Sequence, residues 1–346
     1  MSRTTPPRPV DVTAVLPQLA PLARTATRLH PRPGSPSPHD SSVGGPLLWP
    51  AAEPWPYCEG PHEPDGVNPA VSPADVRRRR RIRAAAASRP PDQPRFTPEE
   101  LAFDEQLRAG RPWPEGPIPM LPVAQLYVRD VPLPVAPERA DLLQVLWCPF
   151  DHLLEPRPRT ALFWRSAATV TEVLVAPPRP AAVQFEDYVP EPCLLDPEQI
   201  TEYPNPMELS GQLQARLDDW ATWQSAGASP DSSYELAPVE FYLNELSLAP
   251  GWKTGGWSRW GLTDPVPRLC AVCDAELTPL LTIASNEWDA STGSWIPYED
   301  QAAAASTAPA HHLAHCPTMI TVGGGYSLQL HVCPVSSDHP RKELVQ

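Results

Sequence analysis

Short apolar runs, bounded by proline or by charged residues, recur along the chain and predict β-strands. A strand buried on one face alternates apolar and polar side chains, whereas a strand buried on both faces is apolar throughout. Both patterns are present in this chain. Six runs are predicted to be strands: residues 123–128, 142–147, 169–176, 239–246, 277–285 and 326–332.

Helical signals are fewer. The best-marked helix begins at Thr97, where Glu100 completes a capping box and Pro98 occupies the first helical position. Weaker helical patterns cover residues 12–29, 74–87 and 207–223. Short strands with a few helices, not in regular alternation, predict a β-rich α+β fold.

Proline is over-represented, at 51 of 346 residues. Each proline removes a backbone donor and fixes φ, so long helices and wide, uninterrupted sheets are disfavoured. The 12 tryptophans argue against disorder, because disordered segments are poor in aromatic residues. The composition predicts a folded protein with long, rigid, proline-rich loops.

The net charge of -14 disfavours nonspecific attraction to nucleic acids or anionic membranes. The exception is an arginine run, residues 77–81 plus Arg83, which is interpreted as a solvated helix face or, alternatively, as a contact for an acidic partner. No run of 18 apolar residues predicts a transmembrane helix, and the first residues lack the apolar core of a signal peptide. A soluble, cytoplasmic location is therefore predicted. There, the seven cysteines are more naturally buried thiols or metal ligands than disulfides.

The two ends of the chain resemble each other. LQVLWCP at 143–149 and LQLHVCP at 328–334 share Leu, Gln, Cys and Pro at the same offsets. Upstream of each lies a Gly-Gly pair, then tryptophan, proline and cysteine, with the pairs at 44–45 and 255–256. This shared order predicts an internal duplication into two similar halves.

The duplication divides the chain into segments. The first is an N-terminal tail with a weak helix, and the two halves are joined by a connecting segment that contains the helix at 207–223. Each half carries one insertion. The boundaries are 1–28 for the tail, 29–176 for the first half with its insertion at 63–117, 177–236 for the connection, and 237–346 for the second half with its insertion at 286–322.

Each half carries Cys and His residues in two close pairs. Structural zinc is commonly held by two such pairs, which the fold brings together into a tetrahedron. The pairs are Cys58 with His62, Cys148 with His152, Cys270 with Cys273, and Cys333 with His339. They predict one structural zinc ion in each half.

Three alternatives stay open for these residues. One half can have lost its metal, or the cysteines can pack as small apolar residues beside unrelated histidines. In the second half, Asp338 or a water can replace His339 as the fourth ligand.

Other chemistry-bearing residues are less specific. A cluster at His311, His312, His315 and Cys316 is interpreted as surface histidines on an inserted loop, with a metal or catalytic role as the alternative. The acidic residues Glu186, Asp187 and Glu191 can supply acid–base pairs, but their spacing is that of ordinary solvated carboxylates.

A closed four-ligand zinc ion leaves no open position for an activated water. The chain also lacks H-E-x-x-H, G-x-S-x-G, a P-loop and a strand-linked G-x-G-x-x-G. The first hypothesis is therefore a binding or interaction protein with an unidentified protein partner rather than an enzyme. Four tryptophans either anchor that partner or pack the core: Trp49, Trp55, Trp257 and Trp260.

Two further functions are weighed against this one. An enzyme would place its site in the cleft between the halves, where pockets commonly form. Nucleic-acid binding, the least favoured hypothesis, depends only on the arginine run and on the zinc-knuckle form of RLCAVCDAEL at 268–277.

Several blocks resemble the YwqG-like domain of unknown function that is widespread in bacteria. They are GGPLLWP at 44–50, PVAQLYVRDVP at 122–132, DLLQVLWCPFDH at 141–152 and GWKTGGWSRWGLTDP at 251–265. The resemblance covers the chain from about residue 29, and the chain is similar to the longer, proline-rich actinobacterial forms. It implies a compact α+β fold with an internal duplication, no assigned catalytic residues, and an immunity or interaction role as one expectation. The insertion at 63–117 departs from the shorter family pattern.

Overall fold

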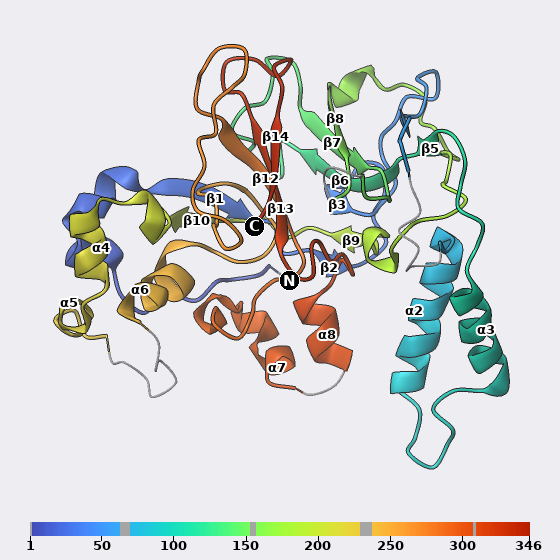
Figure 1. Cartoon of the computed structure of the whole chain (residues 1–346), viewed down its shortest axis with the longest axis horizontal. Helices are drawn as coiled ribbons and strands as arrows, with labels where there is room; N and C mark the ends of the chain where they lie inside the picture. Colours follow the sequence, from blue (N-terminus) through green and yellow to red (C-terminus); the bar gives the residue numbers. More distant parts are fainter. Residues whose placement is uncertain (1, 63–69, 153–156, 229–236, 307–308) are drawn as a thin grey trace.

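A computed structural model describes residues 2–62, 70–152, 157–228, 237–306 and 309–346 (Figure 1). It is an α+β fold, as predicted, built from antiparallel sheets and short helices. The α-helices are α1 (Val12–Val15), α2 (Pro73–Ala87), α3 (Pro98–Ala109), α4 (Gly211–Leu217), α5 (Trp220–Gln224), α6 (Pro238–Phe241), α7 (Gln301–Ala304) and α8 (Pro309–His315). Shorter helical turns include the 3-10 turns Pro17–Leu22, Glu186–Tyr188 and Gly293–Trp295 and the π-helix Tyr242–Ser247.

One six-stranded sheet within the described residues, sheet A, is assembled from three distant parts of the chain. Every neighbouring pair in it is antiparallel. Its strands, in spatial order, are β10 (Glu198–Glu202), β1 (Arg24–Arg28), β11 (Lys253–Gly255), β12 (Thr278–Ala284), β13 (Ser327–Val332) and β14 (Lys342–Val345).

A second six-stranded sheet of the described chain, sheet B, comes mostly from the first half. In spatial order its strands are β2 (Arg32–Pro33), β9 (Cys193–Leu194), β3 (Ser42–Val43), β6 (Leu121–Tyr127), β7 (Leu142–Trp147) and β8 (Thr160–Arg165). A separate two-stranded ladder pairs β4 (Tyr57–Cys58) with β5 (Ile118–Pro119).

The two sheets repeat one series of elements. In each, a short strand runs into a Gly-Gly pair and lies beside a long strand with a proline near its start (β6 or β12). The register of that long strand shifts just after the proline, Pro122 in one sheet and Pro279 in the other. The next strand (β7 or β13) leads directly into Cys-Pro, and an edge strand follows. This is the order that the sequence repeat predicts; an origin by duplication stays a prediction.

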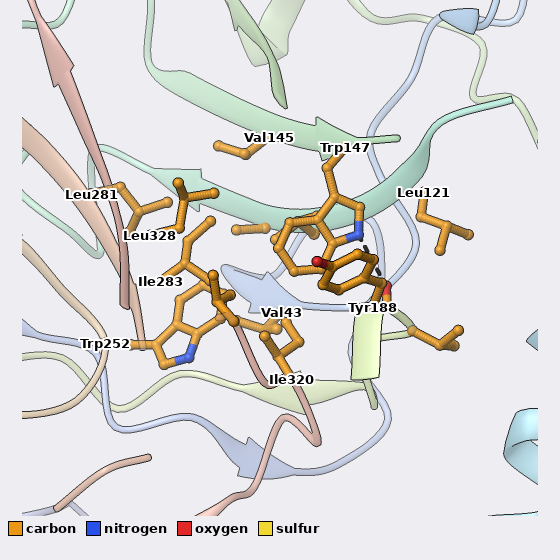
Figure 2. Close-up of a cluster of buried hydrophobic side chains, with 14 of the residues drawn as sticks. Val43, Leu121, Val145, Trp147, Tyr188, Trp252, Leu281, Ile283, Ile320 and Leu328 are labelled. Carbon is orange, nitrogen blue, oxygen red and sulfur yellow. Dashed lines mark hydrogen bonds between the residues drawn. The ribbon is translucent and has the colours of Figure 1, made fainter. Parts of the chain in front are cut away.

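The two sheets share one hydrophobic core (Figure 2). Val145 and Trp147 reach it from β7, and Leu281 and Ile283 reach it from β12, all of them at most 1% exposed. Trp252, which precedes β11, is also in this core. The halves are therefore packed against each other through apolar side chains of one shared core, and each half also has a smaller cluster of its own beside its cysteines.

Both insertions contain two α-helices, and these lie outside the sheets (Figure 1). The first contains α2 and α3, and α3 begins with the predicted capping box between Thr97 and Glu100. The second contains α7 and α8. The helix predicted over 207–223 is divided into α4 and α5, which share a smaller core with Phe241 and Tyr242.

Two predicted strands are wrong. Residues 239–246 form α6 and the π-helix Tyr242–Ser247, because Pro238 suits a helix start and the apolar residues that follow cover one side of a helix. Residues 169–176 form a loop with a single bridge at Val173, and Val175 is 94% exposed. On the side away from β6, β7 pairs with β8, a strand just before that loop that the sequence pattern did not mark.

The N-terminal segment is bonded to the body of the protein, although a loose tail is predicted there. Glu198 of β10 accepts hydrogen bonds from the backbone N–H and the hydroxyl of Thr5. The guanidinium of Arg8 lies 3.5 Å from the ring centroid of Trp295. The helix predicted over 12–29 is correct only for α1 and the turn at Pro17–Leu22, because residues 24–28 form β1.

The tryptophans proposed as partner anchors are mainly core residues. Trp49, Trp55 and Trp260 are 1–7% exposed, so an anchoring role is wrong for these three. Trp257 is half-buried and donates its indole N–H to the Leu22 carbonyl. No helix in the described ranges is both long and apolar enough to cross a membrane.

Candidate metal centres

The fold brings the four predicted ligands of the first half together. Cys58 Sγ lies 3.3 Å from His152 Nε2, and Cys148 Sγ lies 3.2 Å from His62 Nε2. All four ligand atoms lie within 4.8 Å of one another. Tetrahedral zinc, with its usual bond lengths, separates neighbouring sulfur and nitrogen ligands by about 3.3–3.8 Å. The four ligand atoms therefore surround a space of the right size for one zinc ion.

The local backbone explains this convergence. Cys58 ends β4 and Cys148 directly follows β7. Between Cys58 and His62 the chain turns at Gly60, where φ is +88° and a Cβ would lie 3.1 Å from the His62 ring. Only glycine enters such a turn without strain. Trp113 donates its indole N–H to the His62 carbonyl at 2.8 Å and so fixes the loop.

The insertion at 63–117 does not separate the two ligand pairs. The chain leaves after β4 and returns as β5, and these two strands pair with each other. The insertion is therefore closed at its base, beside the cluster.

The two thiols of the first cluster are electrostatically linked. The neighbouring Cys148 thiol, together with His62, lowers the pKa of Cys58 to about 3. Cys58 and burial in turn raise the pKa of Cys148. Ionisation of Cys58 thus disfavours ionisation of Cys148, and a bound divalent cation would favour the thiolate form of both.

The second cluster is equally compact. His339 Nδ1 lies 3.4 Å from Cys270 Sγ and 3.3 Å from Cys333 Sγ, and Cys273 Sγ lies 3.5 Å from Cys333 Sγ. These four ligand atoms also lie within 4.8 Å of one another. His339 therefore completes the cluster, and Asp338 does not belong to it.

Backbone donors support the sulfurs of the second cluster. Cys270 accepts from the N–H of Val272 at 3.5 Å, and Cys333 accepts from the N–H of Val335 at 3.4 Å. Burial alone would raise the pKa of the Cys333 thiol, but the backbone N–H groups that point at it hold that pKa below its ordinary value. The turn after Cys270 and the turn after Cys333 thus each aim a backbone N–H at a sulfur. Such donors stabilise the thiolate, which is the form that binds metal.

The clusters differ in their exposure. In the first, three ligands are buried and His62 is half-buried, whereas in the second Cys273 is exposed and His339 is half-buried. Each cluster can hold a metal ion with four protein ligands. A four-ligand site is closed, so it stabilises the fold and offers no position for an activated water.

The known proteins give no further guidance. No protein-family model matches the chain, and no curated protein matches it.

The other candidate residues lie elsewhere. Among the described residues, the histidines of α8 belong to no cluster with metal-ligand geometry. His315 donates its Nε2 proton to the Trp288 carbonyl at 2.7 Å, and the Cys316 thiol donates to Asn286 Oδ1 at 2.9 Å, which is a structural arrangement. His312 is exposed and lines a pocket of about 1030 Å³ between α2 and α8.

Most of the arginine run is engaged within the protein. Arg80 pairs with Glu191, and both Arg79 and Arg83 pair with Glu186. The run is thus in part a set of internal contacts, which neither interpretation of the sequence anticipated. The acidic partners come from the segment after sheet B's last long strand, far from α2 in sequence, so no local signal predicts them.

Proposed function

We propose that this protein is a binding protein whose fold is stabilised by two structural zinc ions, one in each half. The observation that supports it most directly is the convergence of four ligand atoms in each cluster within 4.8 Å. Cys₂His₂ and Cys₃His are donor sets that structural zinc commonly uses. Membership of the YwqG-like family, an origin by duplication, a cytoplasmic location and an unidentified protein partner belong to this proposal as well.

Metal content tests the zinc part. Native mass spectrometry of protein purified without chelator or added zinc should show two zinc ions per chain. Cys148→Ser should lose the ion of the first cluster, and Cys273→Ser that of the second. Because Cys148 is fully buried, His62→Gln provides a second variant of the first cluster that disturbs the core less. Cys316→Ser removes a thiol outside both clusters and should keep both ions.

The outcomes separate the alternatives. One zinc ion per chain would mean that one cluster has lost its metal. If the chain is folded but contains no metal, both clusters are packed thiols and histidines and not metal sites. That result would contradict the proposal.

An enzyme is the second candidate, and the pocket between α2 and α8 is the observation that favours it. His312, Glu186 and Asp187 all line this pocket, so an imidazole and carboxylates share one cavity. However, Glu186 is already paired with two arginines. If the pocket is catalytic, a ligand bound there should be recovered with an altered mass, whereas a binding protein returns it unchanged.

A further inference from the structure

The pocket between the two insertions lies outside both metal clusters and is formed by parts of the chain that are distant in sequence. One wall is α2, the opposite wall is α8, and the segments at 186–192 and 317–321 complete it. Its volume of about 1030 Å³ is at the upper end of the range for pockets that take a single small molecule.

Two arginines on the α2 wall have no carboxylate partner. Arg77 and Arg81 are four residues apart, so they lie on the same face of the helix. Neither forms an ion pair with any residue in the described ranges, although Glu191 lies close enough to favour the charge on Arg77. Arg81 uses only its Nε, on the Arg77 carbonyl. Their guanidinium forks are therefore available to a ligand.

The charge balance of the lining favours an anion. The carboxylates of Glu186 and Glu191 are occupied by other arginines. Asp187 is the remaining acidic group of the lining, so Arg77 and Arg81 leave an excess of one positive charge. The chain as a whole has a net charge of -14, so a pocket whose lining is positively charged differs from the rest of the protein.

The rest of the lining is apolar. Leu313 of α8 lines the pocket and is 49% exposed, so its side chain can contact a ligand there. Met319 and Ala84 add further apolar surface, and so do the lining prolines Pro33, Pro192 and Pro317. Apolar walls with a few charged groups are typical of small-molecule sites.

We propose that this pocket binds a small amphiphilic anion, with its apolar body against Leu313 and Met319 and its carboxylate or phosphate held by Arg77 and Arg81. The guanidinium fork matches both head groups with two parallel hydrogen bonds. This inference depends on the binding role proposed above and names its ligand class. It is independent of the metal ions.

The test uses the full-length protein and 8-anilinonaphthalene-1-sulfonate, a fluorescent aromatic probe with one anionic group. The probe should bind one molecule per chain and be displaced by decanoate and by decyl phosphate. Whichever of these two compounds binds more tightly identifies the preferred head group. Decanol, which has the chain but not the charge, and inorganic phosphate, which has the charge but not the chain, should each displace it at least tenfold less well.

Variants locate the binding site. Arg77→Gln with Arg81→Gln should weaken decanoate binding at least tenfold, since charge-assisted hydrogen bonds are lost. Arg81→Gln alone, at an exposed position, should weaken it by less. Arg139→Gln removes an exposed arginine outside the pocket and should leave binding within about twofold of the unchanged protein.

The apolar wall is tested in the same way. Leu313→Ser should weaken decanoate binding about fivefold, because about half of a leucine's burial energy is lost. Leu262→Ser, at a similarly exposed leucine outside the pocket, should have no effect.

Three results would overturn the inference. They are equal displacement by decanol and decanoate, unchanged affinity in the double arginine variant, and no saturable binding to protein whose thermal unfolding is normal. Zinc content measured on the same preparation keeps this test separate from the proposed function. Loss of amphiphile binding in protein with two zinc ions refutes only the pocket.

Discussion

Glu202 illustrates how a single buried side chain fixes a turn. Its carboxylate is fully buried and pairs with Lys253 Nζ at 2.5 Å. The same carboxylate accepts the N–H of Ala249 and that of Trp257, both at 2.9 Å. It therefore satisfies the backbone on both sides of the second Gly-Gly pair. A buried charge with this many partners has little freedom to move.

Gly256→Ala should therefore be strongly destabilising. Gly256 has a φ of +70°, and a Cβ there would overlap the Glu202 carboxylate and lie 2.8 Å from the Ala26 Cβ. We expect a loss of about 3 kcal/mol in the free energy of unfolding, measured by urea denaturation. Gly211→Ala is the control, because no atom lies within 4 Å and the residue begins α4. It should stabilise the protein by about 0.5 kcal/mol. Equal effects of the two substitutions would contradict this account.

The metal ligands were the part of the site that could be predicted from the sequence. Close Cys and His pairs are a local signal, and all eight predicted ligands lie in the two clusters. The pairing across the fold follows from the order of the repeat. The pocket could not be predicted, because Arg77 and Leu313 approach each other only through tertiary packing.

At the scale of elements, the central strands were predictable because they are either mostly apolar, as in β6, β7 and β12, or alternate polar and apolar residues, as in β13. β6, β7, β12 and β13 lie where the pattern placed them. β1, with the sequence RTATR, was not predictable, since its polar residues fit a strand only when both β10 and β11 are present to pair with it. Its neighbours are supplied by residues far away in the chain.

The attachment of the N-terminal segment to β10 should weaken in acid. Burial opposes ionisation of Glu198, but its hydrogen bonds with His30 and Thr5 lower its pKa to about 2, below the ordinary value of 4.5. A lowered folded-state pKa contributes stability that is complete above about pH 4.5 and is lost as the pH falls toward 2. The difference in unfolding free energy between the unchanged protein and Glu198→Gln should therefore shrink between pH 5 and pH 3.

Urea denaturation at several pH values measures this difference. Glu138→Gln, at an exposed carboxylate, is the control and should show little difference at any pH. A difference for Glu198→Gln that is independent of pH would show that the carboxylate does not act through its ionised form.

At the scale of the whole molecule, the shared core makes the two sheets one cooperative unit. Ile283 is fully buried in that core on β12, with Val145 and Trp147 of sheet B in the same cluster (Figure 2). Sheet A also includes β1 and β10, which lie outside the second half. A substitution that destabilises one sheet should therefore destabilise the other as well.

Ile283→Ala should lower the free energy of unfolding by about 3 kcal/mol. Hydrogen exchange followed by mass spectrometry should show faster exchange in β6 and β7 as well as in β12 and β13. Val175→Ala, at an almost fully exposed valine, should change neither stability nor exchange. Faster exchange confined to sheet A would mean that the halves unfold separately.

The composition of sheet A also bears on how the chain is synthesised. β1 ends at residue 28, but its partners β10 and β11 begin at residues 198 and 253. At ordinary elongation rates, the ribosome needs on the order of 10 s to make the intervening chain, and β1 stays unpaired meanwhile. An apolar strand left open for so long would invite aggregation, whereas charged side chains discourage edge-to-edge association. Arg24 and Arg28 of β1 are therefore suited to a strand that stays unpaired until its neighbours have been synthesised.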